Sequence, residues 1–171
     1  MLALFCQSIY SDYYIRPISQ PIAGSYNSTS LTGLIHLPTA DLQPVGTVGV
    51  TLGNSSLNKY ASIIASPFDW LEASFYYHRP RDSTYGYEKR GNALDKGFNI
   101  KLVKKFSDIS LAIGVDDIAG TRLFTKEYLV GTVHREGLNV TLGLGTGKFS
   151  GDHPYKNPLP GLENRPTPLF Q

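Results

Sequence analysis

The most constraining feature of this sequence is strict alternation between apolar side chains and polar or small ones. Between Leu138 and Leu144 every second residue is apolar, and the intervening residues are Asn139, Thr141 and Gly143. Successive side chains of a β-strand point to opposite faces of its sheet, so this stretch predicts a strand with one apolar and one polar face.

The same alternation recurs upstream and predicts an all-β fold, an antiparallel up-and-down meander of about seven strands. The expected strands cover residues 47–52, 58–66, 71–77, 97–103, 109–115, 125–134 and 138–144. No stretch has the 3.6-residue apolar period of a helix that could cover such a sheet. The chain also lacks a run of eighteen apolar residues, so the sequence predicts no transmembrane helix.

The connections between the expected strands alternate in length. Short connections cover residues 67–69, 106–108 and 135–137, and long ones cover 78–96 and 116–124, with the tail after residue 145 as a third. Outer-membrane barrels combine short turns at one end with longer loops at the other. The pattern therefore favours a part of a transmembrane β-barrel.

Aromatic side chains lie near both ends of the expected strands. Transmembrane barrels carry aromatic belts at the two membrane interfaces. The belts predicted here contain Phe68, Trp70 and Phe106 beside the short turns, and Tyr76, Tyr77, Phe98 and Tyr128 toward the long loops.

A soluble all-β carbohydrate- or ligand-binding domain is the alternative, in which the apolar faces would form a closed core around a cavity. A soluble sheet needs a second layer over its apolar face. A membrane barrel has lipid there, but it needs closure, because lipid does not tolerate open strand edges. Seven strands is a small and odd number for a bacterial barrel. We therefore expect the chain to be an N-terminal fragment of a longer barrel.

Three regions follow from this pattern. Residues 1–32 are expected to be a signal-like remnant and an extended linker, residues 33–150 the β-barrel segment, and residues 151–171 a Pro-rich tail that forms an outer loop of a truncated chain. The mildly apolar start lacks the basic region of a signal peptide, since the first positive charge is Arg16. It is either the end of an export signal or an ordinary N-terminus.

Cys6 is the one cysteine of the chain, and it follows Ala3-Leu4-Phe5. This context is distantly similar to a lipid-attachment site, although Phe5 is bulkier than the small residue expected before such a cysteine. Cys6 is therefore a weak candidate for lipidation.

No pattern predicts an enzyme, so we expect no catalytic residue, no cofactor and no metal. The four histidines lack metal-ligand spacing. No serine, histidine and aspartate set has a nucleophile motif. Residues 143–148 depart from a phosphate-binding loop, because Leu142 replaces the required glycine and Phe149 follows Lys148. An enzyme with its site on the long loops is the weakest hypothesis.

The long connection over residues 78–96 carries a cluster of basic side chains. They could contact an anionic glycan or a lipopolysaccharide phosphate, or they could simply be an exposed charged loop; the candidates are Arg79, Arg81, Lys89 and Arg90. The formal net charge of the chain is only +2, which argues against nucleic acid as a partner.

Several short motifs carry a family resemblance. Residues 33–40 read GLIHLPTA, residues 99–101 lead into the turn at 106–108, and Gly143-Leu144-Gly145 precedes Gly147-Lys148-Phe149. Together with residues 157–166, they resemble the YjbH-type family of bacterial outer-membrane β-barrel proteins linked to exopolysaccharide biosynthesis, often described as lipoproteins. The likeness covers roughly residues 33–166, and members of the family are several times longer.

The resemblance implies a location in the bacterial outer membrane and a non-enzymatic part in exporting or assembling an extracellular polysaccharide. The partners it implies are outer-membrane lipid and either the polysaccharide or other export proteins. It brings no catalytic residues. In this interpretation the apolar strand faces contact lipid, and the polar faces line the barrel lumen or pack within it.

Overall fold

The computed structural model describes residues 25–54, 58–80, 94–119, 125–136 and 138–147. A short hairpin comes first, formed by β1 (Gly33–Leu34) and β2 (Leu37–Pro38). A larger sheet follows, and its strands are β3 (Thr47–Asn54), β4 (Asn58–Phe68), β5 (Leu71–Pro80), β6 (Asp95–Lys105), β7 (Ile109–Asp116), β8 (Lys126–Arg135) and β9 (Leu138–Gly147). Within the described residues, no helix is both long and apolar enough to cross a membrane.

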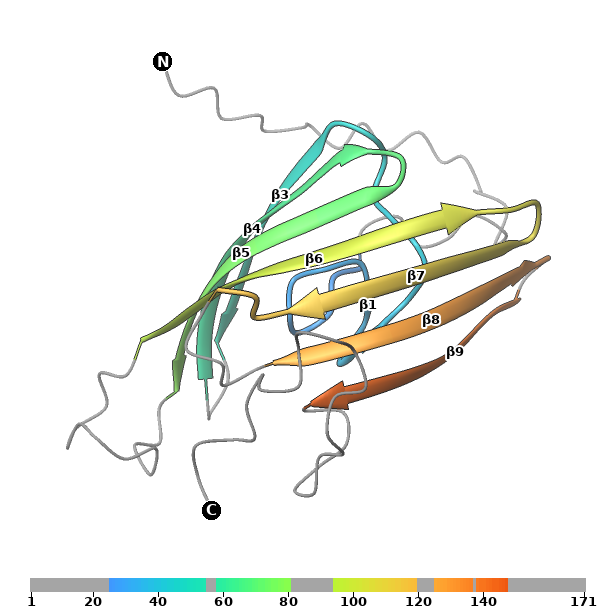
Figure 1. The fold of residues 1–171 in the computed structure, drawn as a ribbon. Helices are drawn as coiled ribbons and strands as arrows, with labels where there is room; N and C mark the ends of the chain where they lie inside the picture. Colours follow the sequence, from blue (N-terminus) through green and yellow to red (C-terminus); the bar gives the residue numbers. More distant parts are fainter. Residues whose placement is uncertain (1–24, 55–57, 81–93, 120–124, 137, 148–171) are drawn as a thin grey trace.

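The larger sheet confirms the predicted seven-strand antiparallel meander. Its strands lie in chain order, from β3 to β9, and every neighbouring pair is antiparallel (Figure 1). Each strand lies within two or three residues of its predicted bounds. Among the described residues β3 and β9 pair on one side only, so the sheet is open and is not closed into a barrel there.

Two tight turns join strands close to the predicted positions, although the first lies one residue later than predicted. Asp69 and Trp70 form the turn between β4 and β5, and a register shift between Ala65 and Phe68 precedes it. Pro67 lies within this shift, where its missing N–H group does not interrupt a regular ladder. In the turn between β6 and β7, the Phe106 N–H donates to the Ile109 carbonyl at 2.8 Å.

The two faces of the sheet have opposite character. On the outer face, large apolar side chains are exposed on all seven strands, and they include Val48, Val50, Leu52, Ile63, Tyr77, Phe98, Ile100, Leu102, Ile109, Leu111, Ile113, Leu129, Leu138, Val140, Leu142 and Leu144. On the inner face, polar side chains are buried, and they include Ser62, Ser66, Glu72, Ser74, Asp95, Asn99, Lys101, Ser110, Asp116, Lys126 and Thr132. This is the reverse of a soluble sheet, whose apolar face is the buried one.

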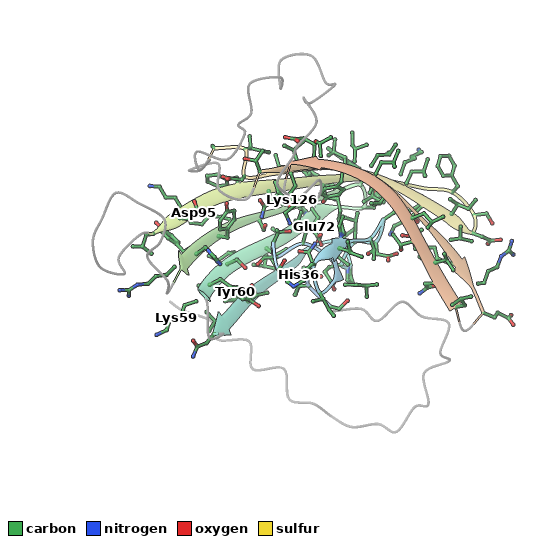
Figure 2. All side chains as sticks on the ribbon, turned by 90° about the horizontal axis from the view of Figure 1, so that it is seen from below. His36, Lys59, Tyr60, Glu72, Asp95 and Lys126 are labelled. Atoms are coloured by element: carbon green, nitrogen blue, oxygen red, sulfur yellow. The ribbon has the colours of Figure 1, made fainter. Side chains whose placement is uncertain are left out.

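The inner face is covered by residues 25–44, which we call the inner segment. The curved sheet arches around this segment, and Glu72 lies on the side that faces it (Figures 1 and 2). Ala40 of the inner segment packs with Val103, Ala112, Tyr128 and Val130 in a small apolar cluster that Leu42 extends. Residues 25–32, which fall in the expected linker, pack under the sheet, since Leu31 and Thr32 are buried. The rest of the expected remnant and linker, residues 1–24, and the expected tail, residues 151–171, lie outside the described residues.

The aromatic belts are only partly as predicted. Phe68, Trp70, Phe106, Tyr77 and Phe98 are exposed, and the Phe68 and Trp70 rings stack with their centroids 5.3 Å apart. The assignment of Tyr76 and Tyr128 to the belt near the long loops is wrong, because both side chains are buried on the inner face of the sheet. The alternation of the strands explains the error, since Tyr76 follows Glu72 and Ser74 on one face while Tyr77 lies on the other.

Buried tyrosines on the inner face lie against glycines of the neighbouring strand. Tyr76 and Gly97 are paired across the β5–β6 ladder, and a Cβ atom on Gly97 would lie 2.6 Å from the Tyr76 hydroxyl oxygen. Tyr128 has the same relationship to Gly114 of β7. A larger residue at either glycine would displace the ring, so these glycines let a tyrosine lie flat across the sheet.

Candidate functional site

Thr32 of the inner segment is bound through three of its groups by an ion pair on the inner face. Its N–H and hydroxyl groups donate to the Glu72 carboxylate at 2.7 and 2.6 Å. Its carbonyl oxygen accepts from the Lys101 ammonium at 2.8 Å. The Lys101 Nζ atom itself lies 3.0 Å from Glu72 Oε2, and both side chains are 0% exposed.

The ion pair is unusually well satisfied. Glu72 also accepts from the Ser66 hydroxyl at 3.3 Å, and the side-chain amide of Gln43 donates to the Thr32 hydroxyl oxygen at 3.2 Å. A buried ion pair loses the hydration of both charges, so it is tolerated only where further hydrogen bonds satisfy the remaining donors and acceptors. Here the inner segment supplies several of those bonds, and the charges on the sheet therefore depend on the segment that covers them.

A second set of contacts fixes the loop just before Thr32. The Thr29 carbonyl oxygen accepts from the Asn99 amide at 2.7 Å and from the Ser74 hydroxyl at 3.3 Å. The loop is shaped from within by Asn27, whose side-chain oxygen accepts from the N–H groups of Thr29 and Leu31 at 3.0 and 3.1 Å. Asparagine commonly stabilises turns by such bonds to the following backbone.

The inner segment also contacts the strands on either side of this centre. The Ala40 N–H donates to the Thr132 hydroxyl of β8 at 2.9 Å, and Asp41 lies 3.4 Å from the His134 ring. On the opposite side, the hydroxyl groups of Ser30 and Thr51 lie 3.0 Å apart. The segment thus spans the inner face from β3 to β8.

Tyr26 lies at the start of the inner segment against β3. A Cβ atom on Gly49 would lie 2.7 Å from the Tyr26 hydroxyl oxygen, so the glycine makes room for the ring. Burial raises the pKa of the Tyr26 phenol above its ordinary value of 10.0, and the negative charge of Glu72 raises this pKa further. The neutral phenol is therefore the form that fits the docked segment.

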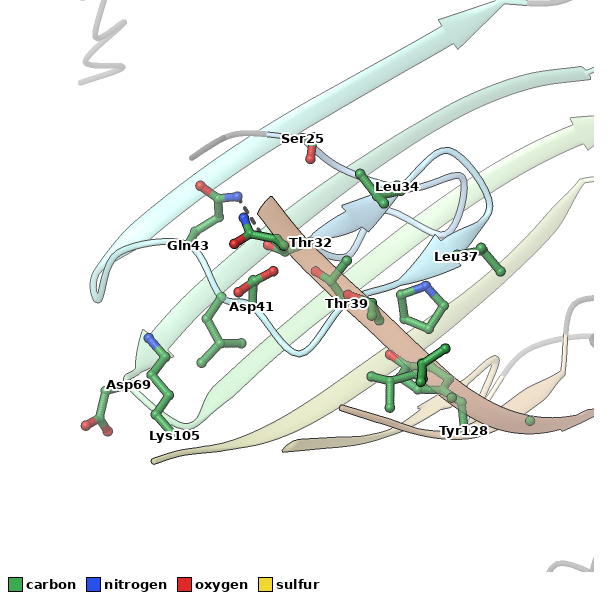
Figure 3. Close-up of a pocket in the computed structure, with 18 of the residues that line it drawn as sticks. Ser25, Thr32, Leu34, Leu37, Thr39, Asp41, Gln43, Asp69, Lys105 and Tyr128 are labelled. Carbon is green, nitrogen blue, oxygen red and sulfur yellow. Dashed lines mark hydrogen bonds between the residues drawn. The ribbon is translucent and has the colours of Figure 1, made fainter. Parts of the chain in front are cut away.

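A cavity of about 740 Å³ lies between the inner segment and strands β8 and β9 (Figure 3). Its polar lining includes Asp41 and Gln43 of the segment, together with Asn139 and Thr141 of β9. Leu142 and Leu144 also border it, although their side chains belong to the outer face, so the cavity extends around the edge of β9 that has no neighbouring strand among the described residues.

The residues predicted to contact a glycan or lipid lie largely outside the described residues. Arg79 is at the end of β5 and its side chain is exposed. Arg81, Lys89, Arg90 and Cys6 fall outside the described residues. The structure therefore leaves the predicted basic cluster untested, as it does the lipidation of Cys6.

Among the described residues, no group of three or more histidine, cysteine, aspartate or glutamate side chains is arranged to hold a metal ion.

A second buried ion pair of the inner face joins Asp116 to Lys126 at 3.6 Å, across the β7–β8 ladder.

Sequence reasoning did not single out Glu72, Lys101, Asn99 or Thr32. A signal for the first two was present, since a glutamate and a lysine occupy polar faces of consecutive expected strands. The prediction assigned those faces to a lumen but did not pair the charges. Chemically, these side chains can bind a polar peptide segment through the backbone and hydroxyl groups of that segment.

The fold and this site define an all-β protein whose sheet buries a polar face that carries ion pairs and exposes an apolar face. The chain belongs to the YjbH family. The family model described as "Exopolysaccharide biosynthesis protein YbjH" matches residues 25–168, which confirms the family predicted from the sequence motifs.

A curated relative supports the same assignment. The chain is 30% identical over 166 residues to "Uncharacterized lipoprotein YjbH" of Escherichia coli (strain K12). The match covers 93% of this chain and 24% of the relative, so the chain spans about a quarter of that protein's length. No solved structure shows significant similarity to the chain.

Proposed function

We propose that the chain forms part of the wall of an outer-membrane β-barrel that takes part in exopolysaccharide export without catalysing a reaction. The observation that carries this proposal is the exposed apolar outer face. Val50 near one edge of the sheet is 67% exposed, and Leu142 and Leu144 at the other edge are 77% and 79% exposed. Monomeric soluble proteins rarely expose a contiguous apolar surface that covers a whole sheet.

The dimensions of the strands support a membrane wall. The seven strands contain 8 to 11 residues each. A transmembrane β-strand needs about 9–11 residues. The stacked pair of Phe68 and Trp70 lies at the short-turn end, and Phe75 and Phe98 are in contact toward the other end, with ring centroids 4.7 Å apart. Aromatic residues at both ends are expected where strands cross the two membrane interfaces.

The polar inner face and the family together support a role in export. A barrel with a polar interior can pass or guide sugars. The description of the matching family names exopolysaccharide biosynthesis. The proposed partners are outer-membrane lipid on the outer face, and the polysaccharide or other export proteins elsewhere. The Escherichia coli relative is named as a lipoprotein, which supports including lipidation of Cys6 in this proposal.

The soluble carbohydrate-binding alternative requires a different arrangement of the same sheet. Its apolar faces would have to meet in a closed core, whereas the described apolar side chains of the outer face are exposed. The alternative thus needs a further layer over that face. The membrane proposal needs only lipid.

The proposal is tested by locating the full-length protein in its own cells. We expect it to sediment with the outer membrane on a density gradient and to migrate differently on a gel before and after heating, as folded barrels do. Recovery in the soluble periplasmic fraction, with migration unaffected by heat, would exclude the barrel. Sugar-binding assays on the soluble protein would then be the next experiment.

A further inference from the structure

The inner segment and the sheet are joined without a shared backbone ladder. Strands β1 and β2 pair with each other, and the seven strands from β3 to β9 pair among themselves. The sheet therefore keeps all its inter-strand hydrogen bonds whether or not the segment is present.

Many of the contacts that hold the segment are polar. Thr32 binds Glu72 and Lys101, Thr29 binds Asn99 and Ser74, and Ser30, Ala40 and Asp41 contact side chains on β3 and β8. Water can replace each of these bonds when the segment leaves, because the groups exposed are carboxylate, ammonium, amide and hydroxyl. The apolar cluster around Ala40 and Leu42 is small by comparison.

The tip of the hairpin, residues 34–37, combines backbone strain with exposed apolar side chains. Ile35 has a φ angle of 40°, in the left-handed region that β-branched residues rarely adopt. Its side chain is exposed, as are those of Leu34 and Leu37. The apolar side chains of the tip therefore bury little surface against the sheet.

The geometry points to a movable plug. With Thr32 seated on Glu72 and Lys101, the inner segment lies across the space that the curved sheet arches over, beside the cavity along β8 and β9, and in this position it blocks the passage of solutes. When the segment leaves, the same polar side chains line an open passage along the inner face. This inference rests on the proposed barrel, because a passage needs a closed wall.

A disulfide across the contact between the segment and the sheet tests the plug directly. Ser30 and Thr51 suit this purpose because their hydroxyl groups lie 3.0 Å apart, one on the segment and the other on β3. The variant Ser30→Cys/Thr51→Cys would be made in the full-length protein with its native cysteines replaced. Ile113→Cys/Leu129→Cys is the matched control, since these residues face each other directly across the β7–β8 ladder and their side chains lie on the outer face, so a bond there leaves the segment free.

The readout is ion conductance of each purified protein in a planar lipid bilayer, under oxidising conditions and after reduction. We expect the oxidised Ser30→Cys/Thr51→Cys protein to lose its open events at least tenfold, and reduction to restore them. The oxidised control should conduct like the unmodified protein.

Two results would overturn the plug. One is undiminished conductance with the segment locked. The other is a complete absence of conductance in the unmodified, reduced and control proteins alike. Heat-modifiable migration of each protein is measured in parallel, so a plug that fails to move can be told apart from a sheet that does not form a barrel.

Discussion

Glu72 of β5 and Lys101 of β6 face each other directly across their ladder, and both are completely buried. Their carboxylate and ammonium groups are satisfied partly by each other and partly by Thr32, which lies 40 residues before Glu72 in the sequence. One charged pair thus joins two neighbouring strands and a distant segment. The consequences of this arrangement can be measured.

Replacing one member of this pair should destabilise the protein strongly. Lys101→Met leaves the Glu72 carboxylate buried without its countercharge, and breaking a buried pair in this way costs about 3–5 kcal/mol. The double variant Glu72→Gln/Lys101→Met removes both charges and should recover a large part of that loss. The measurement is the free energy of unfolding from urea titrations of the full-length protein in lipid vesicles.

An exposed ion pair provides the control for this experiment. Arg135 lies 3.5 Å from Asp108, and both side chains are largely exposed. Arg135→Met should cost no more than about 1 kcal/mol, as is usual for surface pairs. Equal effects of Lys101→Met and Arg135→Met would mean that the inner-face pair is solvated in the assembled protein.

A charge on the outer face distinguishes membrane from water. In a soluble protein, Val50→Lys would be harmless because the side chain is already exposed. Against lipid, a lysine near the middle of a strand costs about 2–4 kcal/mol. We therefore expect Val50→Lys to reduce the heat-modifiable, outer-membrane form, whereas Val50→Leu should assemble normally. Wild-type yields of the folded Val50→Lys protein in the membrane would contradict contact between β3 and lipid.

The tyrosine–glycine contact of β5 and β6 makes a steric prediction. Gly97→Ala places a methyl group 2.6 Å from the Tyr76 hydroxyl oxygen, so the ring must move, at a cost of about 1–3 kcal/mol. Gly131→Ala is the matched control, because its nearest neighbour would be the flexible Leu111 side chain at 3.2 Å. Urea titration of both variants checks the difference. If Tyr76 causes the loss, adding Tyr76→Leu to Gly97→Ala should cost less than the two single effects combined.

Docking of the inner segment should weaken at alkaline pH through Tyr26. Its pKa is raised in the folded protein, so folding favours the neutral phenol. The resulting stability is fully present below pH 10, the ordinary pKa of tyrosine, and is lost as the pH rises through the higher pKa of the folded state. We expect the unfolding free energy of the unmodified protein to fall more between pH 8 and pH 11 than that of Tyr26→Phe. Parallel losses in the two proteins would show that Tyr26 ionises freely while docked.

The strands were predictable because alternation is a local property of the sequence. The pairing of Glu72 with Lys101 was not, because a long connection separates their strands and no tight turn fixes the register. Docking of residues 25–32 was also missed. Their polar composition is typical of a linker, and their partners Glu72, Asn99 and Lys101 are 40 to 70 residues away.

The direction of the strands has a consequence for how this sheet can be completed. Seven consecutive antiparallel strands leave β3 and β9 running the same way. If these two edges met each other, they would form a parallel ladder, which would break the pattern of every other pair in the sheet. A closed ring in which every neighbouring pair is antiparallel needs an even number of strands. Such a ring can therefore be completed from these seven strands only by an odd number of further strands.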